Sequence, residues 1–230
     1  MSVNAPNIFP QVLLVPLGPS TPPLPTAETF ALIIDPGTDW QSVSTSPHIQ
    51  ALRASCPSNG TLFLRIDSLP DACEEALARF LAMGIEGIVL AGCSGTRHIQ
   101  HLATLLRVAE ANANRTDGST RIMAELGGVI EAFLPPRPLA SSRLSAAIFS
   151  EDAAIAATGT EKRKGTNAAV DTMRTSTLLM AAQARISSYL LGDGPAEEFS
   201  GRVVLCGGDP QQQLDQRLGR NISNTSPASQ

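Results

Sequence analysis

The stretch Ile122–Gly128, IMAELGG, reads as a buried strand that ends in an acid and two glycines. The apolar residues of Ile122–Ala124 are continuous rather than alternating, which is typical of a strand covered on both faces of a parallel sheet. In parallel β/α folds, functional groups lie at the carboxyl ends of strands and in the loops that follow them. The stretch therefore indicates the fold class and makes Glu125 a candidate site residue.

Short apolar runs of the same kind recur along the chain. We predict further strands at Val12–Val15, Phe30–Ile34, Leu62–Ile66, Gly87–Leu90, Ala146–Phe149 and Val203–Cys206. Amphipathic helical patterns lie between some of them, at Asp71–Met83, Thr96–Ala111 and Ala169–Leu190. This alternation predicts β/α units around a parallel sheet. We therefore expect an α/β fold, a TIM-type (β/α) barrel with about seven recognisable strands where a complete barrel has eight.

The rest of the chain shows no internal repeat and no second domain. Three segments are expected to be irregular because they are rich in proline or in polar residues: Gly18–Ala27, Leu134–Pro138 and Asn221–Gln230. We expect residues 1–220 to form a single barrel domain and residues 221–230 to form a disordered tail.

The composition is that of a folded protein, with 43% hydrophobic and 17% charged residues. The net charge of −4 comes without a basic stripe, so no nucleic acid is expected as a partner. No apolar run reaches the roughly 18 residues that a membrane span needs, so no membrane is expected either. The four cysteines form no CxxC pair, which favours reduced thiols and a soluble, cytoplasmic protein.

Glu125 and the adjacent acids Glu151 and Asp152 are the residues best placed to hold a metal ion. They follow two different predicted strands, and one carboxylate from each of two neighbouring strands is a common way to bind Mg²⁺. The glycines at 127 and 128 would let backbone N–H groups approach the carboxylate of a ligand. The alternative is that these acids cap the helices that follow, because carboxylates favour helix amino termini.

Arg65 lies near the end of the apolar run LFLRI. An arginine in a buried strand needs an anionic partner, and the sequence allows either a ligand carboxylate or an internal acid. Weaker candidates are the turn Ala91–Gly95, where an anion could bind at a helix amino terminus, and the pair His98 and His101. We expect the two histidines and the basic run Lys162–Lys164 to be solvated.

Seven fragments, in the order in which they occur, resemble the HpcH/HpaI aldolase/citrate lyase β-subunit-like family. FLRID at 63–67 resembles the family's VVRVN, MAELGGVIEA at 123–132 resembles IET-x-x-G-V-x-NA, and IFSEDAAIAATG at 148–159 resembles FGAEDLAADLG. The remaining fragments are LLVPLGPS, ALIID, TMRTSTLLMAAQAR and FSGRVVL. Together they span about four fifths of the chain.

The resemblance implies roles for residues as well as a fold. Arg65 stands where the family's arginine binds the substrate's carboxylate end, and Glu125 and Asp152 stand where its acids ligate Mg²⁺. Gly127 and Gly128 are assigned to substrate binding beside them. The implied activity is that of a carbon–carbon lyase or aldolase acting on a 2-oxo or 3-hydroxy acid, or its CoA thioester, through a metal-stabilised enolate. Mg²⁺, or Mn²⁺ in its place, is the implied cofactor, a small carboxylic acid or acyl-CoA the implied substrate, and a homo-oligomer the expected assembly.

Several positions depart from the family's pattern. Gly37 replaces a glutamate, Ala91-Gly92 replaces a Pro-Lys pair, and Asp67 replaces an asparagine. Residues 187–199 are too few for the strand and helix that the family places there, which predicts a rearrangement, a lost segment or a seam that a partner covers. No general base is identified, and the alternative function is that of a catalytically degenerate homologue acting as a non-catalytic partner subunit.

Overall fold

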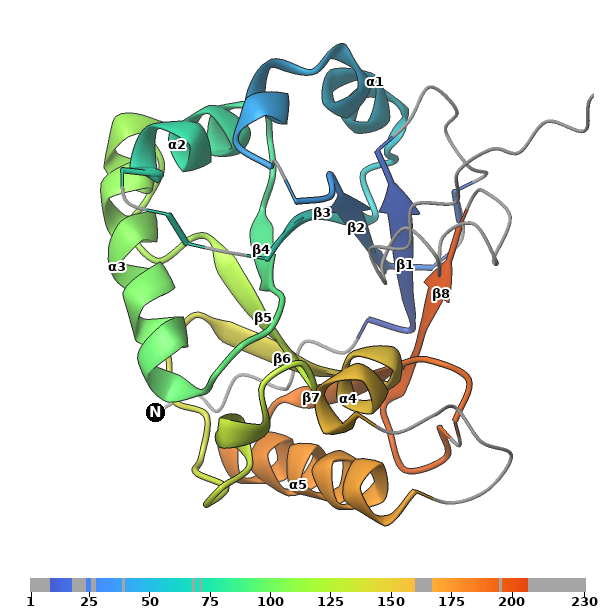
Figure 1. Ribbon diagram of the computed structural model, residues 1–230. Helices are drawn as coiled ribbons and strands as arrows, with labels where there is room; N and C mark the ends of the chain where they lie inside the picture. The colour runs from blue at the N-terminus through green and yellow to red at the C-terminus, as the bar shows by residue number, and fades with distance from the viewer. Residues whose placement is uncertain are drawn as a thin grey trace, which may run out of the picture.

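The computed structural model describes residues 9–17, 24–25, 28–38, 40–67, 69–70, 72–159, 167–194 and 196–206. Within this part of the chain, eight parallel strands follow one another in sequence order and close into a barrel, which Figure 1 views end-on. The last strand pairs with the first, so the ring has no free edge. The strands are β1 (Gln11–Pro16), β2 (Phe30–Asp35), β3 (Gly60–Ile66), β4 (Gly87–Leu90), β5 (Arg121–Leu126), β6 (Leu144–Ser150), β7 (Ser187–Leu191) and β8 (Gly201–Leu205).

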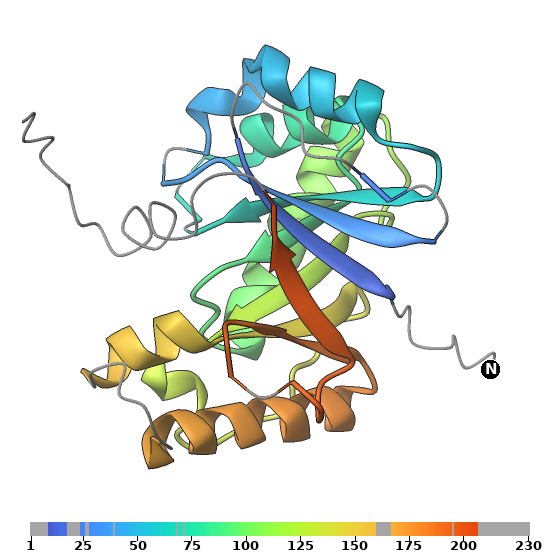
Figure 2. The same ribbon diagram turned by 90° about the vertical axis from the view of Figure 1, so that its right-hand side faces the viewer.

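Helices cover much of the outside of this ring. The helical elements are η1 (Ser42–Thr45), α1 (Pro47–Ser55), α2 (Glu74–Ala82), α3 (Thr96–Asn112), η2 (Ile130–Ala132), α4 (Glu151–Thr158) and α5 (Ala168–Ala184). Figure 1 shows α1, α2 and α3 outside the first half of the ring and α5 outside β6 and β7. Figure 2 shows α4 at the end toward which the strands run. No described helix is long and apolar enough to cross a membrane.

The expectation of a missing strand is wrong, because β7 occupies that place and no seam is left in the ring. The sequence pattern predicts one helix over Ala169–Leu190, but α5 ends at Ala184 and Arg185 adopts a left-handed conformation with φ of 56°. After Ile186 the chain enters β7, which pairs with β6 on one side and β8 on the other. The apolar residues of so short a strand continue the helical spacing, so periodicity alone does not separate the two.

Most of the other predicted elements are confirmed with small shifts. Helix α3 extends the predicted Thr96–Ala111 by one residue, whereas α2 begins at Glu74 rather than at residue 71. Leu134–Pro138 lies outside helices and strands, as expected, and no disulfide joins the four cysteines. The described residues do not include the predicted segments Lys162–Lys164, Asn221–Gln230 and most of Gly18–Ala27.

The strands separate two apolar cores. The outer core lies between the strands and the helices. The inner core fills the barrel and receives side chains from all eight strands. Tyr189 closes part of the interior, since its hydroxyl accepts a hydrogen bond from the N–H of Phe9 (2.9 Å) and donates one to the Phe9 carbonyl (3.2 Å). The barrel is thus a packed core rather than a channel.

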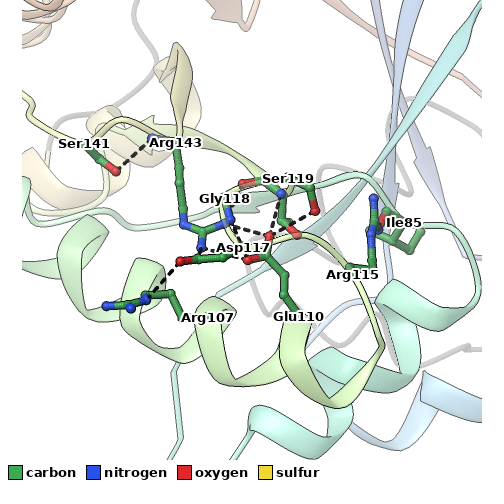
Figure 3. Close-up of polar contacts among 10 residues, drawn as sticks. Ile85, Arg107, Glu110, Arg115, Asp117, Gly118, Ser119, Ser141 and Arg143 are labelled. Atoms are coloured by element: carbon green, nitrogen blue, oxygen red, sulfur yellow. Dashed lines mark hydrogen bonds and ion pairs between the residues drawn. The ribbon is translucent and has the colours of Figure 1, made fainter.

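A buried ion pair joins α3 to the amino-terminal end of β6 (Figure 3). The guanidinium of Arg143 donates to both oxygens of Glu110, at 2.7 and 2.8 Å, and to Asp117 at 2.8 Å. The Glu110 side chain is fully buried and also accepts hydrogen bonds from the backbone N–H groups of Gly118 and Thr120. Burial alone would raise the pKa of Glu110, but these hydrogen bonds outweigh it and lower the pKa to about 2. This end of a barrel serves stability rather than chemistry.

We expect Arg143→Leu to destabilise the fold by about 3–5 kcal/mol, because it leaves the Glu110 carboxylate buried without a counter-charge. The double variant Glu110→Leu/Arg143→Leu should recover part of that loss, since no lone charge is then buried. Urea unfolding followed by circular dichroism measures both values. Equal stability of the wild type and Arg143→Leu would contradict the assigned role.

The same pair gives a defined dependence on pH. The pKa of Glu110 in the fold, about 2, lies below its ordinary value of 4.5, so its contribution to stability is complete above pH 4.5 and is lost as the pH falls toward 2. A shift of this size corresponds to about 3 kcal/mol. The stability difference between the wild type and Glu110→Gln should therefore shrink over that interval. A stability difference between the two proteins that stays constant from pH 5 to pH 2 would refute the assigned pKa shift of Glu110.

Candidate functional site

The polar residues at the mouth of the barrel continue the inward-facing positions of the strands. Ile33, Phe63 and Met123 belong to the inner core, and side chains alternate between the two faces of a strand. Two residues further along the same strands stand Asp35, Arg65 and Glu125, which therefore face the interior at its carboxyl end. The register of the barrel thus brings together polar side chains that are far apart in the sequence.

These side chains line a cavity of about 550 Å³. Among the described residues that line it, four are acidic and one is basic, so the cavity carries a formal net charge of −3. The lining residues are Leu14, Pro16, Leu17, Asp35, Pro36, Gly37, Thr38, Arg65, Asp67, Glu125, Gly128, Ser150, Asp152, Ala153, Ala156, Ala157 and Leu205. The sequence predictions Arg65, Glu125, Asp152 and Gly128 are therefore found in one cavity.

Arg65 and Glu125 form a two-pronged ion pair within this cavity. Nε of Arg65 donates to Oε2 of Glu125 at 2.7 Å and Nη2 donates to Oε1 at 2.9 Å. Asp35 lies at 3.5 Å from Nη1, and its own carboxylate accepts a hydrogen bond from the N–H of Gly37 at 3.1 Å. Of the two partners that the sequence allows for Arg65, the structure shows the internal acid.

The charge of Arg65 is strongly maintained. Burial alone would lower the pKa of its guanidinium, but the carboxylates of Glu125, Asp35 and Asp67 outweigh burial and raise the pKa above its ordinary value. A guanidinium has five N–H donors, whereas its two bonds to Glu125 use one on Nε and one on Nη2. The remaining donors give Arg65 the capacity to bind an anionic ligand without leaving Glu125.

Asp152 and Glu151 begin α4 but have different surroundings. Asp152 lines the cavity, whereas the carboxylate of Glu151 is buried in an ion pair with Arg174 at 2.7 Å. Both acids lie in the first turn of α4, where the helix dipole favours negative charge. Both acids therefore lie at a helix start, as the alternative interpretation expects. Only Asp152 also lines the cavity.

The two glycines after β5 also differ in their surroundings. Gly128 lines the cavity, with only ordinary contacts around the position that a Cβ would take. Gly127 has φ of +125°, and a Cβ there would stand 2.4 Å from the backbone oxygen of Ser150. Gly127 is thus required for the close approach of its loop to the β6–α4 junction, whereas Gly128 is open to a ligand.

The weaker candidates from the sequence lie outside the lining of the cavity. The turn Ala91–Gly95 is stabilised locally, since the N–H of Gly95 lies 3.4 Å from the sulfur of Cys93. His98 accepts a long hydrogen bond from the N–H of Ser94, and burial, together with the nearby His101, lowers the pKa of His98. These contacts stabilise the start of α3 and bring no chemistry to the cavity.

The donors in the cavity suit a hard divalent cation that carries most of its own ligands. No group of three or more metal-binding side chains comes together among the described residues, so a closed protein cage is not present there. Glu125 and Asp152 would supply one or two oxygens each, and waters and ligand oxygens would complete an octahedron, as Mg²⁺ prefers. The pairing with Arg65 is compatible with this, because a carboxylate offers about four lone-pair sites and Arg65 occupies two of them.

The sequence reading missed the small apolar wall of the cavity. Ala153, Ala156 and Ala157 line it from α4, and Pro16 and Leu205 add further apolar surface. The spacing of these alanines is the helical i, i+3, i+4 pattern, which was available in the sequence once α4 was recognised. The wall makes one side of the cavity apolar while the base of the cavity is charged.

No protein-family model matches the sequence, and no curated protein is found as a relative. Solved structures do match the fold. An HpcH/HpaI aldolase from Desulfitobacterium hafniense DCB-2 is 12% identical with a TM-score of 0.59, over 96% of each chain. Haloferax volcanii malate synthase in a ternary complex with pyruvate and acetyl-CoA is 12% identical, with a TM-score of 0.63 over 97% of this chain and 72% of that one.

A third match is an HpcH/HpaI aldolase/citrate lyase family protein from Burkholderia cenocepacia J2315. It is 13% identical, with a TM-score of 0.55 over 83% of this chain and 82% of that one. At such low identity the likeness concerns the backbone, and it covers at least 83% of this chain in each case. The chain has the fold of the HpcH/HpaI aldolase/citrate lyase family proteins and of malate synthase.

Proposed function

We propose that this protein is a Mg²⁺-dependent carbon–carbon lyase of the aldolase type, acting on a 2-oxo or 3-hydroxy acid or its CoA thioester. The observation that carries the proposal is the convergence of Arg65, Glu125 and Asp152 in one cavity at the carboxyl end of the barrel. That end is where β/α barrels place their active sites. The fold shared with aldolases and malate synthase supports the same reaction class.

The charge of the cavity supports a cation. The side chains of the cavity, with a formal net charge of −3, would by themselves repel an anionic substrate, and a divalent cation bound by Glu125 and Asp152 would reduce that charge to −1. Such an ion supplies a Lewis acid that stabilises negative charge on substrate oxygens during cleavage or formation of a carbon–carbon bond. Mn²⁺ has compatible ligand preferences and serves as a probe.

Arg65 is the group that would bind and orient the acid. It is the single basic side chain among the described residues of the lining, and its contact with Asp35 at 3.5 Å is much longer than its contacts with Glu125. A ligand carboxylate would replace that longer contact first, while Glu125 keeps the guanidinium in place. Holding the substrate in one orientation lowers the entropic cost of the reaction.

The lining also favours a particular shape of substrate. One guanidinium binds one carboxylate, and the wall of Ala153, Ala156 and Ala157 offers only apolar contact. A mono-acid with an aliphatic remainder, or an acyl thioester whose polar part extends outward, suits this arrangement better than a compact tricarboxylate. We expect discrimination against each added carboxylate because the described lining holds no basic side chain besides Arg65 to pair with it.

We expect Mg²⁺ or Mn²⁺ to stabilise the protein, and pyruvate or oxaloacetate to add a further shift. At a metal concentration a hundred times the Kd, the stabilisation is about 2.7 kcal/mol, or roughly 5–10 °C in Tm. Asp152→Ala and Glu125→Gln should abolish the metal-dependent shift, because each removes one of two protein ligands. A thermal-shift titration with and without the acids measures this.

Glu75→Gln is a suitable control for that titration, since Glu75 is an exposed acid of α2 that pairs with Arg79 and does not line the cavity. It should keep the full metal-dependent shift. A wild-type protein whose Tm does not respond to either metal, with or without the acids, would overturn the proposed function.

Arg65→Met should separate binding of the acid from binding of the metal. The substitution removes the two hydrogen bonds from Arg65 to Glu125 and makes the cavity more negative, so the shift caused by Mn²⁺ should be retained or increased. The additional shift caused by pyruvate should disappear, because its carboxylate has lost its partner. An unchanged response to pyruvate in Arg65→Met would show that Arg65 is only a structural partner of Glu125.

A second function, that of a catalytically degenerate homologue acting as a non-catalytic partner subunit, is favoured by one observation. Both oxygens of Glu125 accept hydrogen bonds from Arg65, so the pair already satisfies itself without a ligand. Gly37 and Gly92 also lack the side chains that the family's pattern has there. The metal titration separates the two functions, because the non-catalytic one predicts no response.

A further inference from the structure

We infer that Glu151 is a positioning residue: its buried carboxylate ties the start of α4 to α5 and to the β7–β8 connection, and thereby holds Asp152 at the cavity. The inference rests on the proposed function for the role of Asp152, and it concerns a residue that has no contact with the cavity. The two adjacent acids at the start of α4 then have different roles: Glu151 fixes the position of the helix, and Asp152 lines the cavity.

The carboxylate of Glu151 is satisfied from three directions. Oε1 accepts a hydrogen bond from Nη2 of Arg174 at 2.7 Å. Oε2 accepts hydrogen bonds from the backbone N–H groups of Asp193, at 3.0 Å, and Gly194, at 2.8 Å. The residue is only 8% exposed, so these partners replace water and hold the carboxylate in one place.

Arg174 is itself held by its surroundings. Its Nη1 donates to Asp171 of the same helix at 2.9 Å, and its guanidinium lies 6.0 Å from the ring centre of Phe149 in β6. The Phe149 ring in turn stacks on Phe199 of the β7–β8 connection. These contacts hold the guanidinium in one position, so its hydrogen bond to Glu151 also fixes the orientation of the Glu151 carboxylate.

The β7–β8 connection is shaped to fit around Glu151. A Cβ at Gly192 would stand 2.6 Å from the Glu151 Cβ, and a Cβ at Gly194 would stand 2.4 Å from its Oε1. Only glycine allows the backbone to approach this closely. From the other side, the guanidinium of Arg202 donates to the carbonyls of Gly192 and Gly194. The connection is thus held through its N–H groups by Glu151 and through its carbonyls by Arg202.

This arrangement constrains Asp152 because it is the next residue in the same helical turn. Successive side chains of a helix point about 100° apart, so fixing the direction of Glu151 fixes that of Asp152. The described part of the β7–β8 connection contains no helix, and α4 lies beyond the ends of the strands (Figure 2). The hydrogen bonds and ion pair of Glu151 therefore restrain the first turn of α4 against the β7–β8 connection and α5.

The molecule offers a closely matched control in Glu110. Glu110 is also buried, also pairs with one arginine, and also accepts hydrogen bonds from two backbone N–H groups of a loop. It lies at the opposite end of the barrel, among the residues of Figure 3, with no part in the cavity. Glu151→Gln and Glu110→Gln thus make the same chemical change in the same kind of environment, near the site and far from it.

The test compares Mn²⁺ affinity, by titration calorimetry, in the wild type and these two variants. Both variants should have a lower Tm, but only Glu151→Gln should weaken Mn²⁺ binding, by about 10–100-fold, as is typical when a residue that orients a ligand is lost. Glu110→Gln should keep the wild-type affinity. Equal Mn²⁺ affinity in the two variants would overturn the inference.

Amide hydrogen exchange separates failure of the inference from failure of the proposed function. If the wild type binds no Mn²⁺, the proposed function fails, and exchange alone then decides whether the tie exists. In Glu151→Gln, amides of both 150–158 and 190–194 should exchange faster, whereas in Glu110→Gln they should not. Unchanged exchange in 150–158 would overturn the inference.

Arg202→Met is a milder variant for use if Glu151→Gln does not fold. It loosens the connection at an exposed position without touching Glu151. It should weaken Mn²⁺ binding and speed exchange in 150–158 in the same direction. No change in either measurement would count against the tie.

Discussion

The alternation of side chains along the strands of a closed barrel is the constraint on which the site depends. The inner core takes residues from the inward face of each strand, and Asp35, Arg65 and Glu125 are the next inward-facing residues of β2, β3 and β5. A shift of one residue in the pairing of β3 or β5 would turn these charges toward the apolar helices. Burial of the inner-core residues therefore determines which way the charged residues of the same strands point. Contacts between the charges are not needed for this.

Once the ring sets these directions, the ion pair of Arg65 with Glu125 becomes the natural resting state of the cavity. A guanidinium and a carboxylate that both face a confined interior must neutralise each other or remain poorly solvated. The excess of acids over the one arginine nevertheless leaves a negative cavity, so the pair does not complete the electrostatics of the site. The proposed divalent cation would reduce that remaining charge from −3 to −1, and it would also let an anionic ligand approach Arg65.

The sequence predicted the parts of this protein in which local pattern and tertiary role agree. Continuous apolar runs that end in polar residues identified most strands and, with them, Arg65, Glu125 and Asp152 as neighbours at one end of the barrel. It failed at β7, where Ser187 and Ser188 make a buried strand look polar and the helical spacing of α5 continues into it. The residue pattern by itself did not separate Glu151 from Asp152, because adjacent acids at a helix start look equivalent until their partners are known, and only the family resemblance assigned the metal to Asp152.

The contacts of Glu151 also show how the barrel is completed although the connection between β7 and β8 is short. In a β/α barrel the helix between two strands covers the sheet and fixes the loops around it. In the described part of the β7–β8 connection, side chains serve that purpose: Glu151 holds the backbone N–H groups, Arg202 holds the carbonyls, and Phe199 packs on Phe149. Because Glu151 is also the first residue of α4, the contacts that close the ring and those that aim Asp152 are the same. A substitution in the β7–β8 connection would therefore change the position of Asp152 in the cavity, although the described part of the connection does not itself line the cavity.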